Sequence, residues 1–458
     1  MIGSLVDLLY IAASVLFILG LKGLSSPETA RRGMLLAEIG MLMAIVGTLL
    51  HHDIVSYEWI VAGFLLGSVI GVPIAVLIPM TKLPERIALS HAFGGLAAAM
   101  VGVSEYYRHG EELGAIKMGA IGFEVMLGAL TFTGSMMAFG KLQGVITGVP
   151  VTYRFQNVSN ISLFAVTIGS VAYLVYDPSR HALFYAMLGL AFLVGLLFVL
   201  PIGGADMPVV ISLLNSYAGL AASATGFVLS NNVLIIAGAL DGASGFFLSI
   251  IMSKAMNRSF TNVLFGAFGA IAETAPVSVA QTAGVNEGSL EDAGMLLENA
   301  RSLIVVPGYG MAVAQAQHAV RELADLVAKH GATVKYAIHP VAGRMPGHMN
   351  VLLAEANVPY DQLYDLDAIN DDFSATDVAL VVGANDVVNP AAKTNPRSPI
   401  YGMPVLNVDL ARSVIVLKRS MNPGFAGIEN DLIVRPNTMM VFGDAKQTLT
   451  RIVAELKK

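Results

Sequence analysis

A glycine motif after a short apolar run is the first feature of this sequence that could do chemistry. Gly308-Tyr-Gly310 follows the apolar residues 303–306 and precedes the periodic residues 311–320, which predicts a strand, a tight turn and a helix. Glycine permits the turn and a close ligand approach, and a helix N-terminus offers unpaired N–H groups to an anion. The pattern is typical of a dinucleotide pyrophosphate site. Its third glycine position holds Val313, so a plain strand–helix turn stays an alternative.

A second candidate binding segment follows the apolar residues 413–417, which predict a buried strand. Lys418, Arg419 and Ser420 come directly after this run and before a glycine-containing loop. Two cations and a hydroxyl at a strand end suit a phosphate monoester, which accepts charge-assisted hydrogen bonds. We prefer this interpretation to the structural alternative, a solvated Lys-Arg pair.

Three further apolar runs indicate a parallel sheet. The last of them, residues 439–442, predicts the final strand, followed by a turn at Gly443-Asp444 and a closing helix over residues 446–456. Residues 378–382 lead into Gly383-Ala-Asn-Asp386, and polar groups at the carboxyl ends of parallel strands usually bind the ligand, although a plain Asn/Asp turn fits as well. Residues 335–338 end without the acidic side chain that holds the ribose 2′-hydroxyl of NAD, and Arg344 follows. This favours NADP over NAD.

The composition separates the chain that carries these groups into two parts. Of 458 residues, 55% are hydrophobic and 13% charged, with a mean hydropathy of +0.68, whereas a soluble domain has roughly 25% charged residues. Residues 1–263 are nearly continuous apolar blocks, residues 264–290 predict a linker rich in small residues, and residues 291–458 alternate strand-like and helix-like runs. The expected fold is a polytopic α-helical membrane domain of about nine spans, followed by a soluble α/β Rossmann-like domain with a parallel sheet.

The totals also exclude several classes of site and partner. A net charge of −6 gives no basic face for nucleic acid. The absence of cysteine excludes disulfides and thiolate metal sites, and we expect no metal site. The N-terminus lacks a basic region before its first apolar run, so this run is expected to be a retained span rather than a signal peptide.

Loop charges predict the orientation of the membrane domain. With an odd number of spans and an outside N-terminus, the inner loops hold most of the lysines and arginines. They are Lys22, Arg31, Arg32, Lys82, Arg86, Lys141, Arg154, Lys254 and Arg258, against Arg108, Lys117 and Arg180 outside. We therefore expect a multi-pass protein of the cytoplasmic (inner) membrane, in contact with lipid, with its C-terminal domain in the cytosol.

Polar residues inside the apolar blocks need an explanation, because each costs a few kcal/mol unless it is paired or hydrated. They are His91, Glu124, Asn215 and Asp241, with Asp206 at the inner end of a span. Interhelical hydrogen bonding explains one such residue, but a histidine and two carboxylates in one bundle favour a proton relay. A Na⁺ pathway would use the same carboxylates.

The soluble part contains no obvious catalytic acid, base or nucleophile. Hydride transfer between two nicotinamides needs none, because the cofactors carry the chemistry. One dinucleotide fold cannot hold both donor and acceptor, so a redox enzyme of this type requires a second cofactor domain on another chain. The alternative from another class is a transporter or channel with a redox-sensing dinucleotide domain.

Over nearly its whole length the chain resembles the β subunit of the proton-translocating NAD(P)⁺ transhydrogenase family. The resemblance is carried by residues 203–210, 214–217, 254–259, 307–317, 338–355, 383–386 and 418–422. It implies reversible hydride transfer between NADH on a separate α subunit and NADP⁺ on this C-terminal domain, coupled to proton translocation. It also implies a dimer of αβ units.

The resemblance implies roles for individual residues. His91, Asn215 and Asp206 are tied to proton translocation, and Glu124 joins them in our expected set. Lys418, Arg419 and Ser420 hold the 2′-phosphate, Asp386 lies on the nicotinamide side, Tyr309 covers the cofactor, and Arg344 contacts the pyrophosphate. The expected NADP(H)-binding set is Gly308, Tyr309, Gly310, Met311, Ala312, Val341, Ala342, Gly343, Arg344, Gly383, Asn385, Asp386, Lys418, Arg419, Ser420, Gly424, Ala426, Gly427 and Asp444.

Two positions depart from the family pattern. Phe425 stands where a tyrosine is frequent, so a hydroxyl contact is not carried over. Asp241 stands where the family commonly has an apolar residue, and it is either an added proton or ion site or a helix–helix pair.

Overall fold

The computed structural model describes the whole chain except residues 1, 51–56, 80–81, 110–113, 148–149, 256–259, 266–283, 346, 397, 399, 425 and 458. Most of the expected linker, 264–290, and Phe425 therefore lie outside the described residues. The chain forms two compact units, Met1–Gly203 with Val210–Ser249, and Gly204–Val209 with Ile250–Lys458.

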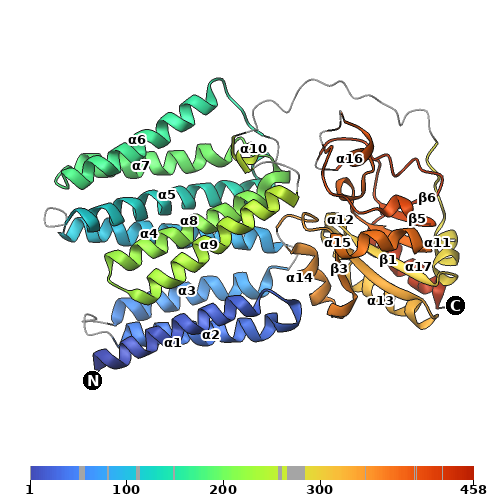
Figure 1. Cartoon of the computed structure of the whole chain (residues 1–458), viewed down its shortest axis with the longest axis horizontal. Helices are drawn as coiled ribbons and strands as arrows, with labels where there is room; N and C mark the ends of the chain where they lie inside the picture. Colours follow the sequence, from blue (N-terminus) through green and yellow to red (C-terminus); the bar gives the residue numbers. More distant parts are fainter. Residues whose placement is uncertain are drawn as a thin grey trace. The chain divides into compact units, whose positions relative to one another are not determined.

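Long apolar helices make up the first unit (Figure 1). They are α1 (Ile2–Gly23), α2 (Pro27–Leu49), α3 (Glu58–Leu77), α4 (Leu83–His109), α5 (Ala115–Gln143), α6 (Gln156–Tyr176), α7 (His181–Val199), α8 (Met207–Val228) and α9 (Asn232–Ala255). Within the described residues, these nine helices are long and apolar enough to cross a membrane. The predicted number of spans is confirmed.

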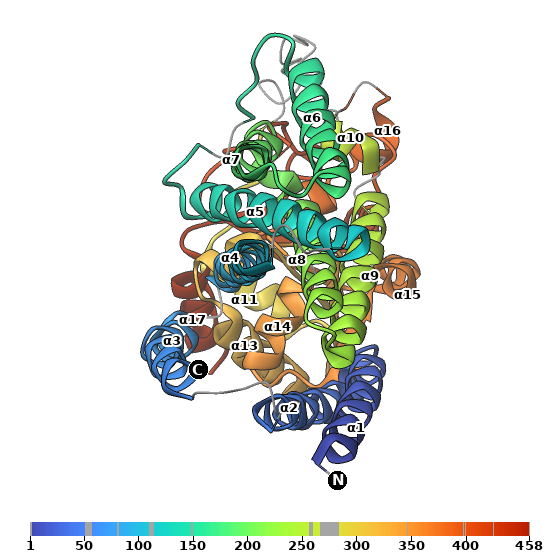
Figure 2. The same cartoon turned by 90° about the vertical axis from the view of Figure 1, so that its left-hand side faces the viewer.

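The helices differ in how deeply they are buried in the bundle. In the most apolar segment of α5 and of α8, 61% and 67% of the residues are buried, whereas no described residue of α3 is buried. Close contacts explain the burial of α5: a Cβ on Gly128 would lie 2.5 Å from the carbonyl oxygen of Gly95 on α4. Figure 2 views the helices end-on, with α5 between α4 and α7. Polar side chains on α5 and α8 are therefore inside the unit.

One charge in the orientation argument is not a free loop cation. Lys141 lies in the last turn of α5, is buried, and donates to the carbonyl oxygens of Leu200 (2.6 Å) and Ile202 (2.7 Å). These carbonyls follow the C-terminal end of α7, where a cation is favourable. Lys141 is therefore a charge at a span end, as the orientation argument requires, although it is paired with backbone carbonyls.

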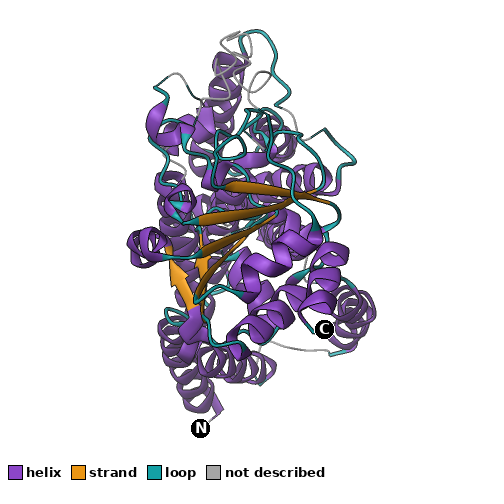
Figure 3. Cartoon of the chain, turned by 90° about the vertical axis from the view of Figure 1, so that its right-hand side faces the viewer, coloured by secondary structure: helices purple, strands orange, loops and turns teal. Residues whose placement is uncertain are grey.

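The second unit contains a six-stranded parallel sheet in the order β3-β2-β1-β4-β5-β6. Figure 3 shows its strands in orange with helices beside them. Its strands are β1 (Ser302–Pro307), β2 (Thr333–Ile338), β3 (Leu363–Asp365), β4 (Val378–Val382), β5 (Ser413–Lys418) and β6 (Thr438–Phe442). This is the doubly wound order, with the topological switch point between β1 and β4. The predicted fold class is confirmed for both parts of the chain.

The two faces of this sheet are covered differently. Helices α11 (Leu290–Glu298), α13 (Gln317–Lys329) and α17 (Ala445–Leu456) pack together on one face. On the other face, Ile304, Val306 and Val414 pack against Phe373 and Leu406 from short helices and loops. The longest described helix between β4 and β5 is α16 (Ala391–Thr394), so the crossovers of this half are mostly irregular.

Two local features differ from the sequence prediction. The expected single helix over 311–320 is wrong: α12 (Tyr309–Val313) ends before α13 begins, and Gln315 between them has a left-handed φ of 50°. Strand β3 was not predicted, because its three residues carry no apolar run.

Candidate functional site

A cleft of about 650 Å³ opens at the carboxyl ends of β1, β4 and β5, on the switch point of the sheet. Open α/β sheets bind ligands at this point, and the volume suits a cofactor. Fourteen residues of the expected NADP(H)-binding set line this cleft. They are Gly308, Tyr309, Gly310, Val341, Ala342, Gly343, Gly383, Asn385, Asp386, Lys418, Arg419, Ser420, Gly424 and Ala426. Segments far apart in the sequence therefore meet in one cleft.

The glycines at the base of the cleft join two turns through their backbones. A Cβ on Gly308 would lie 2.4 Å from the Cα and N atoms of Ala384, and one on Gly310 would lie 2.7 Å from the Cα of Gly383. The Gly308 N–H donates to Val382 O and the Gly310 N–H to Gly383 O, both at 2.9 Å. These two N–H groups therefore hold the β1 and β4 turns together, and what glycine supplies here is close backbone approach.

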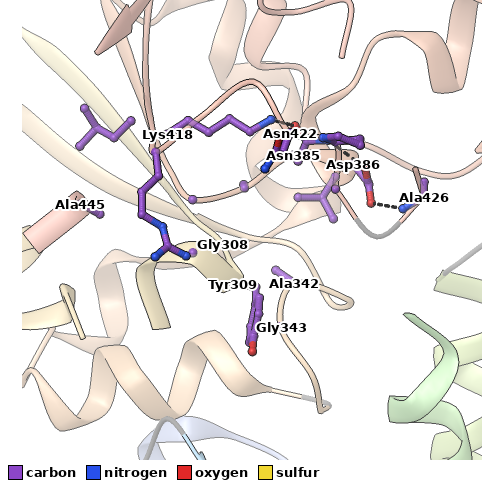
Figure 4. A pocket seen from close by; sticks show the side chains of 18 of the residues that line it. Gly308, Tyr309, Ala342, Gly343, Asn385, Asp386, Lys418, Asn422, Ala426 and Ala445 are labelled. Atoms are coloured by element: carbon purple, nitrogen blue, oxygen red, sulfur yellow. Dashed lines mark hydrogen bonds between the residues drawn. The ribbon is translucent and has the colours of Figure 1, made fainter. Parts of the chain in front are cut away.

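Tyr309 forms part of one wall of the cleft, and Arg344, which is outside the lining, stacks on its ring. The guanidinium carbon of Arg344 lies 4.4 Å from the centroid of the Tyr309 ring, a cation–π distance. The backbone N–H of Arg344 donates to Nδ1 of buried His348 at 3.1 Å, and Gly343 has a φ of 115°. Figure 4 shows Tyr309 beside Ala342 and Gly343. Burial, with a smaller effect from Arg344, lowers the pKa of His348 to about 4, so this imidazole is a neutral acceptor at pH 7.

The turn after β2 is also held by His339, which is 1% exposed. Its Nε2 lies 2.7 Å from Pro404 O, and its Nδ1 accepts from the Val341 N–H at 3.2 Å. A ring that accepts at Nδ1 must donate at Nε2, so these partners fix the tautomer. Burial lowers the pKa of His339 to about 4 despite the Pro404 contact. This structural role could not be predicted, because no sequence pattern around His339 distinguishes it.

Across the cleft, a chain of hydrogen bonds runs from the end of β5 through the turn after β4 to the loop after β5 (Figure 4). Lys418 Nζ donates to Asn385 Oδ1 at 2.8 Å, and Asn385 Nδ2 donates to Asp386 Oδ1 at 3.0 Å. Asp386 Oδ2 accepts from the Ala426 N–H at 2.9 Å. Burial lowers the pKa of Lys418, while the Asp386 carboxylate opposes this shift. Arg419 and Ser420 are exposed next to Lys418.

Some expected residues do not line the cleft, and others line it unexpectedly. Met311 and Ala312 are buried in the fold, and Asp444 caps α17 by accepting from the N–H groups of Lys446 and Gln447. Arg344 and Gly427 are likewise outside the lining. The lining residues that we did not expect are Ala314, Ala384, Val387, Ile400, Met403, Leu417, Asn422, Pro423, Gly443 and Ala445. Most are apolar and carry no chemical signal, although Gly443 follows a predicted strand and could have been found.

The polar residues of the membrane bundle lie in two groups. Glu124 on α5 is fully buried, and its Oε1 accepts from Thr225 Oγ1 of α8 at 2.8 Å. In the second group, Asn215 on α8 donates to Asp241 on α9 at 3.0 Å, and His91 on α4 lies close to Asn215. Asp206 ends the short helix η3 (Gly204–Asp206) directly before α8, and it is buried. Thr225 was missed, because a threonine in an apolar helix gives no signal by itself.

Comparison with known proteins agrees with this architecture. The family model described as NAD(P) transhydrogenase beta subunit matches residues 6–455. Two relatives named NAD(P) transhydrogenase subunit beta, one from Rhodospirillum rubrum and one from a designated strain of that species, are each 52% identical over 459 aligned positions. Each alignment covers 98% of this chain and 98% of the relative. The chain therefore belongs to the family of NAD(P) transhydrogenase β subunits.

Proposed function

We propose that the C-terminal domain, residues 291–458, binds NADP(H), and that Lys418, Arg419 and Ser420 hold its 2′-phosphate. The observation that carries this proposal is the partly buried Lys418 ammonium at a strand end in the cleft, beside a second cation and a hydroxyl. Burial disfavours the charged ammonium, and a phosphate dianion would offset that cost through charge-assisted hydrogen bonds. NAD(H) lacks this phosphate, so the arrangement favours NADP(H).

The rest of the cleft suits the remainder of the cofactor. We assign the pyrophosphate to Arg344, which stacks on Tyr309, and the nicotinamide side to Asp386. Bound NADP(H) supplies the hydride chemistry itself. The chain supplies the phosphate-binding cations and an aromatic wall. NAD(H) would be held by a separate α subunit, and reversible hydride transfer would take place between the two.

The membrane domain, residues 1–263, would couple this transfer to proton translocation. His91, Asn215, Glu124 and Asp206 are the residues we assign to the proton path. Protonation in the bundle would change the affinity for NADP(H) through residues 264–290, and linkage makes this effect reciprocal. The loop charges favour an outside N-terminus and a cytosolic C-terminal domain in the cytoplasmic (inner) membrane. The assembled enzyme would be a dimer of αβ units.

The cofactor assignment is tested by NADPH titration of the full chain in detergent. Replacing Lys418 and Arg419 together by Ala removes two charge-assisted contacts of about 1.5–3 kcal/mol each, so affinity should fall about a hundredfold or more. Lys329→Ala, in the last turn of α13, is the control because it removes an exposed lysine of the same domain that does not line the cleft. Equal NADPH affinity in the double variant and the control would refute the phosphate assignment.

The coupled activity is tested with the chain and its α subunit reconstituted in vesicles. Hydride transfer from NADH to NADP⁺ should accelerate under an imposed proton gradient, and the reverse reaction should move protons across the membrane. Binding of NADPH without any hydride transfer would instead support a transporter or channel with a redox-sensing domain.

A further inference from the structure

A carboxylate in the middle of α9 takes part in a hydrogen bond that the proton path above does not use. Asp241 is the tenth residue of α9 (Asn232–Ala255), about 14 Å along the helix from its start. Its Oδ1 accepts from Nδ2 of Asn215 on α8 at 3.0 Å, and its side chain is exposed on the bundle. Asn215 also lies close to His91 on α4. One amide therefore lies beside two titratable side chains from two other helices.

Glycines hold this arrangement in place. Helices α8 and α9 lie side by side in both views (Figures 1 and 2), and a Cβ on Gly219 would lie 2.4 Å from Gly242 N. The same Cβ would lie 2.9 Å from Asp241 Oδ2, and a Cβ on Gly245 would lie 2.9 Å from Asn215 Nδ2. Both glycines thus leave the space that the carboxylate and the amide occupy.

We propose that Asp241 is a proton-exchanging group of the membrane domain, and that the Asn215 amide couples its protonation state to that of His91. This inference rests on the proposed proton translocation and adds a residue to it. An exposed charge in mid-span is costly in lipid, so a carboxylate there is either neutralised by a proton or reached by water. Both alternatives require exchange with an aqueous phase.

The amide couples the two groups because it has different atoms at its two ends. While Asp241 is ionised, Asn215 turns its NH₂ toward the carboxylate and can offer its oxygen to an imidazole N–H of His91. A protonated Asp241 is a donor and needs the amide oxygen, so the NH₂ turns toward His91, which must then present a lone pair. No proton crosses the amide. The carboxyl gains its proton from water. The protonated imidazole then loses the amide oxygen that accepted a hydrogen bond from its N–H, so its neutral form is favoured.

Among the described residues, none of the other titratable groups on the elements around α9 is hydrogen-bonded to Asp241. Tyr10 on α1 is hydrogen-bonded to Thr48 and Asn231, and Glu124 on α5 to Thr225. The remaining ones on these elements are Asp7 on α1, Tyr217 on α8, Asp206 before α8, and Lys254 in the last turn of α9. Among the described side chains, Asn215 provides the hydrogen bond to Asp241.

The test compares pH profiles of reverse hydride transfer and proton uptake in membranes that contain both subunits. Asp241→Asn removes a negative charge near His91, so the half-maximal pH should fall by about one unit. Asp241→Glu keeps the carboxylate and should retain the wild-type profile. In a protein that already carries His91→Asn, adding Asp241→Asn should cause no further shift of the half-maximal pH. Asp7→Asn, which removes an exposed carboxylate from another span, is the control and should match the wild type.

Two results would overturn the proposal: a profile for Asp241→Asn that superimposes on the wild type, or a shift that persists without His91. If Asp241→Asn does not accumulate, infrared difference spectra of the complex with isotope-labelled aspartate decide instead. The titration midpoint of an aspartate carboxyl band must move when His91 is replaced, and an unchanged midpoint rejects the coupling. A wild-type complex that moves no protons would refute the proposed function itself, whereas normal pumping with an unaltered Asp241→Asn profile refutes only this inference.

Discussion

Replacing Gly308 by alanine should disrupt the junction between the β1 and β4 turns. The added Cβ would meet backbone atoms of Ala384 at 2.4 Å, and backbone cannot rotate away as a flexible side chain can. Overpacking of this kind costs about 1–3 kcal/mol. Separating the turns also weakens the 2.9 Å hydrogen bonds from Gly308 N and Gly310 N, each worth about 1 kcal/mol. The expected loss is about 3–5 kcal/mol, a large part of the stability of an ordinary domain.

The assay is amide hydrogen exchange of the solubilised chain, read at β1 and β4, together with NADPH titration. A loss of about 3 kcal/mol corresponds to local opening more than a hundredfold more frequent, so exchange should accelerate by about that factor. Gly294→Ala is the matched control, because its Cβ would meet nothing closer than Glu455 Cβ at 3.9 Å and it lies within α11. If the Gly308→Ala variant showed the wild-type exchange rate and the wild-type NADPH affinity, the turns would accommodate the added Cβ at no free-energy cost. That result would refute the reasoning.

Two further predictions concern buried polar groups. His339 and His348 have folded pKa values of about 4, below the ordinary 6.5, so their contribution is complete above pH 6.5 and is lost as pH falls toward 4, by about 1.4 kcal/mol per pH unit for each group. The protection factor of the 338–348 turn, which is its exchange rate corrected for the intrinsic effect of pH, should therefore fall between pH 6.5 and 4. His339→Asn should weaken this pH dependence, and a protection factor that does not change with pH in the wild type would contradict the prediction. Thr225→Val leaves the Glu124 carboxyl without its 2.8 Å partner and should destabilise the bundle by about 1–3 kcal/mol in thermal unfolding, while Thr225→Ser should not.

The membrane helices and five of the six strands were predictable because their signals are local. A run of apolar residues long enough to span a bilayer has few other structural solutions, and short apolar runs between glycine turns are typical of buried parallel strands. Strand β3 and the break at Gln315 were not predictable, since three residues show no period and a left-handed glutamine is set by its surroundings.

The chemistry of the cleft was easier to predict than its apolar lining. Lys418 and Asp386 could be chosen because charged groups at strand ends are rarely needed for packing. Their connection through Asn385 could not be, because it depends on the distance between two loops separated by the whole of β5. In the same way, Glu124 was conspicuous in its apolar helix, whereas Thr225, which satisfies it, was not.

The hydrogen bonds made by the Gly308 and Gly310 N–H groups determine which groups of the protein remain to bind the anionic parts of a cofactor. In an ordinary dinucleotide fingerprint the turn after the first strand offers its N–H groups to the pyrophosphate. Here the N–H groups of Gly308 and Gly310 are used within the fold, and α12 has five residues. The anionic parts of a bound cofactor must then be met mainly by side chains, and the cations suitably placed are Lys418 and Arg419 after β5 and Arg344 after β2. Such side chains belong to separate loops, so a change in the position of either loop would alter cofactor affinity more than it would where a rigid backbone turn provides the binding.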